Sequence, residues 1–244
     1  MRNAALFAFI AALAVTAPAA AQDLDIPPAR IPTLPATVLN LDGLIPAGWR
    51  METKALGDLD GDGVTDVAMV VQGADRALVL ANEGFGSERL DTNPRMLVVA
   101  LGRKGGGYRV LVQNATLIPR HTMPTMSDPF DWEAGGLAIH GRTIRVRLEL
   151  FMNAGGWGMS NTTYSFRWQN NRLELIGYDL NETQRNSGET RSVSINYSTG
   201  KVKISTGNIE RDAQQVSWKT LPNRRRLSIE QVGDGLEFDS GFNE

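Results

Sequence analysis

Cysteine is absent from the 244 residues of the chain. Disulfide bonds, thiolate metal ligands, a cysteine nucleophile and a lipidated cysteine anchor are therefore all excluded. There are two histidines, His121 and His140, whereas a zinc site takes about three or four histidine or cysteine ligands. We expect both histidines to be surface residues, with His140 at a hairpin before Gly141.

An excess of charge of one sign is also lacking, because 25 Lys and Arg residues stand against 27 Asp and Glu residues. A formal net charge of −2 does not give the basic surface of a general nucleic-acid binder, so no nucleic-acid partner is expected. After the first 21 residues no apolar run is long enough for a membrane span. No G-x-S-x-G motif presents a serine nucleophile.

The first 21 residues have the features of a secretory signal peptide. Arg2 supplies a positive start, residues 4–15 form an apolar run too short to cross a bilayer, and an A-x-A sequence precedes Gln22. We expect cleavage after Ala21 and a periplasmic or secreted location. The alanine-rich signal and the lack of cysteine favour a bacterial cell envelope.

The remaining chain is divided by its proline content and its apolar pattern. Residues 22–43 are rich in proline and predict an extended leader, and residues 44–118 predict a β subdomain that contains the aspartate-rich loop described below. Residues 119–134 hold three prolines and predict a connecting loop. Residues 135–244 predict an antiparallel β-meander subdomain.

Alternation of apolar and polar residues predicts the strands of that meander. Apolar side chains occupy every second position of residues 143–150, and turns are expected at Asn170-Asn171 and Thr199-Gly200. Three short closing strands are expected, over residues 215–220, 226–232 and 235–240. The predicted fold class is all-β, with antiparallel meander sheets and room for one short helix within residues 74–92.

Four aspartates are crowded into the sequence GDLDGDGVTD, residues 57–66. Counted from the first aspartate, the carboxylates fall at positions 1, 3, 5 and 9 and a glycine falls at position 6. Calcium takes about six to eight oxygen ligands, and carboxylates this close repel one another without a cation. We therefore predict a Ca²⁺ ion bound by side-chain oxygens, the backbone carbonyl at position 7 and water. The predicted protein ligands are Asp58, Asp60, Asp62, Val64 and Asp66.

The pattern is not that of an EF-hand, because position 12 is Met69 instead of the bidentate glutamate. D-x-D-G-D-G-x-x-D followed by an apolar strand resembles the calcium loops of FG-GAP and VCBS repeats, which lead into β-strands. The motif occurs once, so a complete repeat propeller is not expected. The alternative is a polar turn in which the aspartates accept local N–H groups.

A wider resemblance covers about residues 44–220. The segments LIPAGWRM, NPRMLVVAL, YSFRWQNNRLELIGYD and SINYSTGKVKIS, in this order around the aspartate loop, look like an uncharacterised family of bacterial exported proteins with a single such loop. The resemblance implies export and calcium binding. It brings no known activity.

The glycine-rich sequence MNAGGWGMSNTT places Trp157 at the tip of a loop, with Asn153 and Asn161 nearby. An indole there can stack on a sugar or anchor a partner protein, and the two amides can donate hydrogen bonds. Alternatively, Trp157 folds back over the open end of the sheet. We favour this second arrangement, because an exposed tryptophan is unfavourable without a ligand.

These features favour a noncatalytic, calcium-stabilised binding protein of the envelope, with an envelope protein or a glycan as its partner. One alternative is an envelope hydrolase that acts on glycan or peptidoglycan through paired carboxylates such as Asp128 and Asp131. Such a pair would lie about 5–10 Å apart in a cleft. Another alternative is a toxin inhibitor or immunity-type protein.

Overall fold

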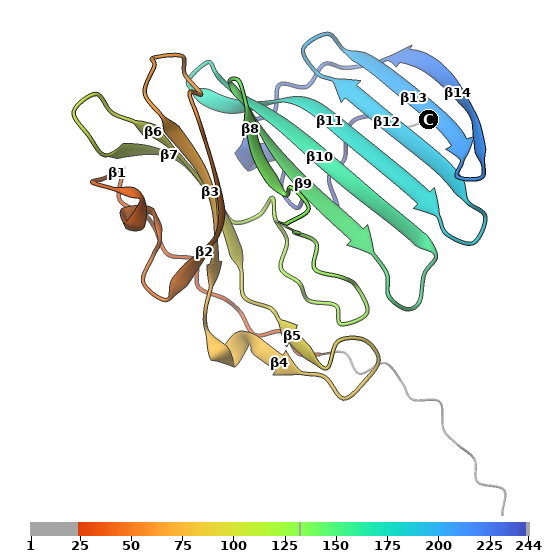
Figure 1. The fold of residues 1–244 in the computed structure, drawn as a ribbon, viewed down its shortest axis with the longest axis horizontal. Helices are drawn as coiled ribbons and strands as arrows, with labels where there is room; N and C mark the ends of the chain where they lie inside the picture. Colours follow the sequence, from red (N-terminus) through yellow and green to blue (C-terminus); the bar gives the residue numbers. More distant parts are fainter. Residues whose placement is uncertain (1–23, 132, 243–244) are drawn as a thin grey trace, which may run out of the picture.

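The chain forms two antiparallel β-sheets that share one core, as a computed structural model that describes residues 24–131 and 133–242 shows (Figure 1). The small sheet has the order β1-β7-β6-β3-β2. Its strands are β1 (Thr37–Val38), β2 (Trp49–Gly57), β3 (Asp66–Gly73), β6 (Arg95–Gly102) and β7 (Tyr108–Asn114). A separate ribbon consists of β4 (Val79–Ala81) and β5 (Arg89–Asp91).

The large sheet is a meander in which every strand pairs with the strands before and after it in the sequence. Its strands are β8 (Leu137–His140), β9 (Thr143–Phe151), β10 (Gly158–Gln169), β11 (Arg172–Gln184), β12 (Glu189–Asn196), β13 (Lys201–Asn208) and β14 (Arg211–Thr220). The β10–β11 turn holds Asn170 and Asn171 at φ 53° and 58°, which confirms the predicted position of this hairpin. The all-β class is thereby confirmed, and the described residues form no repeat propeller.

Helical structure among the described residues is confined to three 3-10 turns, η1 (Leu41–Leu44), η2 (Arg76–Leu78) and η3 (Ile229–Gln231). One short helix was considered possible within residues 74–92, and the structure has only the 3-10 turn η2 there. None of these turns has the length or apolar character that crossing a bilayer requires.

Two of the three predicted closing strands are wrong. Residues 226–232 contain η3 and a single bridge from Ser228 to Glu174, and residues 235–240 lie in no strand. The reason is that tyrosine hydroxyls take the place of a neighbouring strand. Tyr164 donates to the carbonyl of Gly235 at 2.6 Å, and Tyr197 donates to the carbonyl of Ser240 at 2.9 Å. The C-terminal segment therefore fills the core instead of extending the sheet.

Strand β3 is buried on both faces and links two hydrophobic clusters. Ala68 and Val70 belong to the main cluster, which also contains Val146 and Tyr164 of the large sheet. On the opposite face, Val67, Met69 and Val71 belong to a second cluster. This second cluster is covered by the apolar residues Leu34, Val38, Leu41 and Ile45.

The extended leader thus forms one cover of the small sheet. The Gln113 amide fixes it at two points, accepting from the N–H of Leu34 at 2.8 Å and donating to the carbonyl of Pro32. Nearer the start of the leader, the carbonyl of Pro27 accepts a hydrogen bond from Arg120 at 3.0 Å. These three contacts hold a segment that has no regular structure of its own before Thr37.

Replacing Gln113 by leucine removes both contacts of the amide and should loosen the leader. We expect protection of the Leu34 amide against hydrogen exchange to fall by about tenfold, because one net hydrogen bond is worth about 1 kcal/mol. Exchange measured by NMR or mass spectrometry checks this. Gln215→Leu, on the exposed strand β14, should leave leader exchange unchanged, and an unaltered Leu34 rate in Gln113→Leu would contradict the prediction.

Candidate metal centre and ligand-contact surface

The aspartate loop, residues 58–65, connects the neighbouring strands β2 and β3. Gly61 and Gly63 have φ of 84° and 82°, the left-handed region in which glycine is strongly favoured, so the chain can reverse within a few residues. Leu59 is fully buried in the core between the sheets. The loop is therefore folded back onto the core instead of projecting from it.

Three of the four aspartates converge. Side-chain oxygens of Asp58, Asp60 and Asp66 lie within 4.8 Å of one another. Two oxygens bound to one calcium ion, each at about 2.3–2.6 Å, can be up to about 5 Å apart. The donor atoms and the spacing of this group are compatible with a bound calcium ion.

Asp62 lies outside this group and is exposed. Its Oδ1 atom accepts the backbone N–H of Val64 at 2.8 Å. Asp58 accepts the N–H groups of Gly61 at 2.7 Å and Gly63 at 3.0 Å, so the hydrogen bonds of a polar turn are present as well. These bonds direct the carboxylates inward and hold the loop in one conformation.

Asp66 is the buried member of the group. Its Oδ2 atom accepts the N–H of Leu59 at 2.7 Å, and its Oδ1 atom accepts the N–H of Gly102 at 2.8 Å. Burial raises the pKa of Asp66, the two backbone N–H groups oppose this rise, and the nearby charge of Asp60 adds to it. A cation placed at this carboxylate would relieve both of the effects that raise its pKa.

Arg142 in the β8–β9 turn anchors the loop to the large sheet. Its guanidinium donates to the carbonyls of Leu59 at 3.1 Å and Asp60 at 2.8 Å. This residue could not be predicted from the sequence, because no local pattern indicates that two turns distant in the chain meet. The arginine thus fixes the backbone beside the three converging carboxylates.

Arg95 is the centre of a second charged group. Its guanidinium binds both oxygens of Glu52 at 2.7 and 3.0 Å and both oxygens of Asp128 at 2.7 Å. Burial disfavours the charge of Arg95, but hydrogen bonds to both carboxylates outweigh it and raise the pKa of the guanidinium. The sequence could have indicated this site, because Arg95 is the first residue of a strand buried on both faces and a buried charge requires a partner.

The two carboxylates named for a hydrolase are both engaged in structural hydrogen bonds. Asp128 is bound to Arg95 as described, and Asp131 accepts the N–H groups of Glu133 at 2.9 Å and Ala134 at 3.0 Å. They border a hollow of about 480 Å³ that also contains Glu52 and Arg95. A hydrolase of this kind presents both carboxyl groups to the substrate, whereas Asp128 is held in a pair with Arg95 and Asp131 caps its own loop.

Trp157 is 63% exposed, so the expectation that it folds back over the sheet is wrong. Arg185, which directly follows β11, explains the exposed position. Its guanidinium donates to the carbonyls of Met152 at 2.6 Å and Gly156 at 2.7 Å, and it lies 4.4 Å from the Phe151 ring centre. The place beside the sheet is thereby occupied by Arg185, whose guanidinium is 6.0 Å from the Trp157 ring centre.

The two asparagines of the predicted contact bond to other neighbours. Asn153 accepts the Ser127 hydroxyl at 3.4 Å, and Asn161 on β10 accepts the Asn181 amide at 3.2 Å. Asn161 lies on the face of the large sheet that points away from the core, since the next residue, Thr162, is buried. We name this face, to which Trp157 is adjacent, the outer face.

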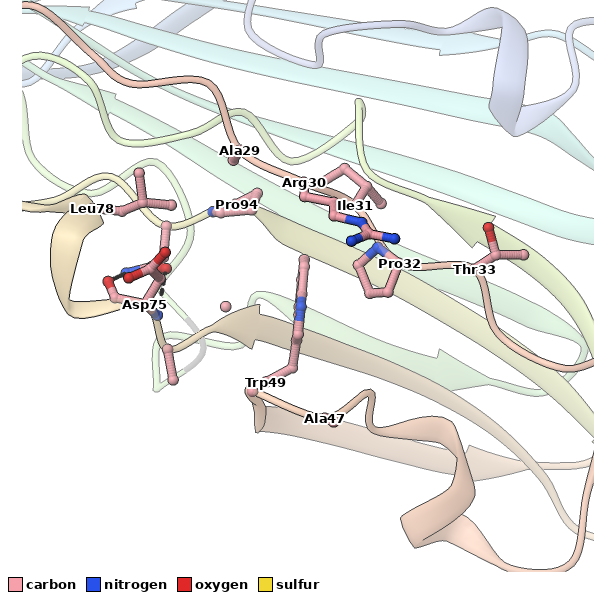
Figure 2. A pocket seen from close by; sticks show the side chains of 14 residues that line it. Ala29, Arg30, Ile31, Pro32, Thr33, Ala47, Trp49, Asp75, Leu78 and Pro94 are labelled. Atoms are coloured by element: carbon pink, nitrogen blue, oxygen red, sulfur yellow. Dashed lines mark hydrogen bonds between the residues drawn. The ribbon is translucent and has the colours of Figure 1, made fainter.

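A further hollow, of about 640 Å³, lies beneath the leader. Figure 2 shows the Trp49 ring standing in it, with Pro32 and Thr33 on one side and Asp75 and Leu78 on the other. The Asp75 carboxylate accepts the N–H of Ala77 at 2.9 Å as the cap of η2. The Asp75 carboxylate therefore serves local structure.

One of the two histidines is buried, although both were expected at the surface. His140 is exposed, but His121 is buried, with its Nε2 atom 2.7 Å from the carbonyl of Met126. The expectation that His121 is a surface residue is wrong, because the proline-rich connecting loop folds around its ring. Neither histidine belongs to the carboxylate group of the aspartate loop.

Comparison of the chain with protein-family models, with curated proteins and with solved structures gave no match.

Replacing Arg95 by methionine should destabilise the protein strongly, because Glu52 would remain buried without its partner. The expected loss is about 3–5 kcal/mol in the free energy of unfolding, measured by urea denaturation. Arg147→Met, which removes the partly exposed pair with Glu149, should cost less than about 1 kcal/mol. Equal losses in the two variants would contradict the importance given to Arg95.

Proposed function

We propose that the chain is an exported, noncatalytic binding protein of the bacterial cell envelope that is stabilised by calcium. The observation that carries the proposal is the convergence of three carboxylates in one loop, with their oxygens within 4.8 Å. The signal-like first 21 residues and the FG-GAP-like spacing of the loop support export and the choice of ion.

The ion would be held by Asp58, Asp60 and Asp66, with further oxygens from Asp62, the Val64 carbonyl and water. Its role would be structural, because Asp66 also joins the loop to the N–H of Gly102 at the end of β6. Bound calcium would neutralise the loop at the point where β2 and β6 end and β3 begins. This would favour docking of β3 between its two clusters.

Binding is proposed for the surface around Trp157. The indole is exposed and the backbone on both sides of it is fixed by Arg185, so little conformational entropy would be lost on contact with a ligand. Asn161 and Asn181 offer amide groups on the adjacent outer face. An aromatic ring beside amides suits a sugar or a peptide, the two partner classes expected for an envelope protein.

A noncatalytic role is supported by the way in which the acidic groups are used. Arg95 binds Asp128, and Asp131 caps its own loop. Glu174 is similarly engaged, since burial raises its pKa but hydrogen bonds from Asn170, Gln169 and Arg172 outweigh this and lower it. The Asp128 and Asp131 carboxylates are thus engaged in structural contacts, and the lowered pKa of Glu174 does not suit a general acid at neutral pH.

Calcium should raise the melting temperature of chelator-treated protein by several degrees. At a concentration tenfold above the dissociation constant, the ion adds about 1.4 kcal/mol of stability. Asp60→Ala should abolish the response, whereas Asp75→Ala, which removes an aspartate cap elsewhere, should retain it. Differential scanning calorimetry gives the comparison, and identical curves with calcium and with chelator would remove the ion from the proposal.

Trp157→Ala should weaken capture of the envelope partner by about tenfold or more, as expected for an aromatic anchor. The measurement is retention of envelope proteins, peptidoglycan and glycans on immobilised protein, in calcium and in chelator. Phe85→Ala, which removes another exposed aromatic ring, is the control and should not change retention. Equal retention by the wild type and Trp157→Ala would place binding elsewhere.

A further inference from the structure

Strand β14 ends the large sheet with an unpaired edge. It pairs with β13 on one side, and within the described chain no strand pairs with it on the other (Figure 1). All its described side chains are exposed. Exposed edges are usually shortened, bent by a bulge or interrupted by proline. The β14 strand has an irregularity in its ladder before Gln215, but it spans ten residues without proline and its register is regular from Gln215 to Thr220.

The direction of the free backbone groups follows from the ladder with β13. Leu221 donates its N–H to Gly200 at 2.8 Å, so alternate residues counted back from Leu221 face β13. The residues between them direct their N–H and C=O groups to the open edge. These residues are Gln214, Val216, Trp218 and Thr220.

The same four residues place their side chains on the outer face. Trp218 lies opposite Lys203, whereas Ser217 lies opposite the buried Ile204. Val216 is 51% exposed and Trp218 is 65% exposed, and they are adjacent on this face. The open edge therefore combines unpaired backbone groups with an apolar pair.

We propose that β14 pairs antiparallel with β14 of a second copy of the chain, about a twofold axis at Ser217. This register places residues with edge-directed groups opposite one another: Val216 faces Trp218 of the second copy, and Gln214 faces Thr220. Because the axis repeats each contact, two valine–tryptophan pairs form. Aromatic and β-branched residues are favourable cross-strand neighbours.

Charge at the two ends of β14 supports the antiparallel direction. Lys201 and Lys219 lie at the end near Thr220, and Arg224 lies beside Gly200 there. Glu189 and Glu210 lie at the opposite end, beside the β13–β14 turn, and outnumber one arginine, Arg211, among the named charges there. Antiparallel pairing brings the basic end of each copy to the acidic end of the other.

Pairing would join the two large sheets into one continuous sheet with a single outer face. The contact uses neither the aspartate loop nor Trp157, so it is independent of the proposed calcium and binding roles. If those roles hold as well, the dimer would present two Trp157 sites on one particle, and a partner with repeated units would bind by avidity.

Ser217→Cys tests the register directly, because the natural chain has no other thiol. At the axis, two opposed residues of a non-hydrogen-bonded pair have Cα atoms about 4.5 Å apart, which suits a disulfide. Protein expressed from the full sequence should form a disulfide-linked dimer on mild oxidation. Gln215→Cys is the matched control. Its side chain lies on the same face of β14 as that of Ser217, but in the proposed register it is offset by about four residues from Gln215 of the second copy. This variant should therefore stay monomeric.

Sedimentation equilibrium of the uncrosslinked protein tests the association itself. We expect a concentration-dependent dimer, and Val216→Pro should raise its dissociation constant by about tenfold or more, since proline removes an edge-directed N–H but no bond to β13. Circular dichroism checks that the variant is folded, and Trp218→Lys gives a second disruption that leaves the backbone unchanged. A protein that is monomeric at all concentrations would overturn the proposal, even if it binds foreign extended peptides at β14. A dimer that neither substitution weakens would overturn it as well. So would equal crosslinking of Ser217→Cys and Gln215→Cys.

Discussion

Burial of β3 on both faces is the constraint on which the rest of the structure depends. A strand enclosed in this way must have a cover on each side, and the large sheet supplies one while the leader and η1 supply the other. Any charge that enters the enclosed sheet must be compensated. Arg95 is therefore bound by Glu52 and Asp128, and Asp66 by two backbone N–H groups. The aspartate loop is the turn by which the chain enters this strand.

Three arginines connect loops to the sheets in a similar manner. Arg95 holds the connecting loop through Asp128, Arg142 holds the aspartate loop through two carbonyls, and Arg185 holds the Trp157 loop through two others. A guanidinium is suited to this because its several donors lie in one plane and bind separate acceptors at once. The surfaces proposed for calcium and for a ligand are thus held by side-chain contacts although they are built from loops.

The sequence predicted what depends on local pattern and missed what depends on distant contacts. Alternation located β9, glycine and asparagine located the hairpin turns, and aspartate spacing indicated carboxylates that the structure brings together. Residues 235–240 also alternate, but the pattern does not reveal that Tyr164 would bind their backbone. Exposure of Trp157 was missed for the same reason, because it depends on Arg185, which is distant in the sequence.

The role of the C-terminal segment has a consequence for the order of folding. The hydroxyls of Tyr164 and Tyr197 find their acceptors only in residues 235–240, and Phe238 packs 5.7 Å from both Tyr164 and Tyr178, measured between ring centres. Burial of a phenol without an acceptor is costly, so the centre of the meander is less stable while residues 235–240 are not in place. Completion of the core therefore depends on a segment that is synthesised after all the strands of the meander.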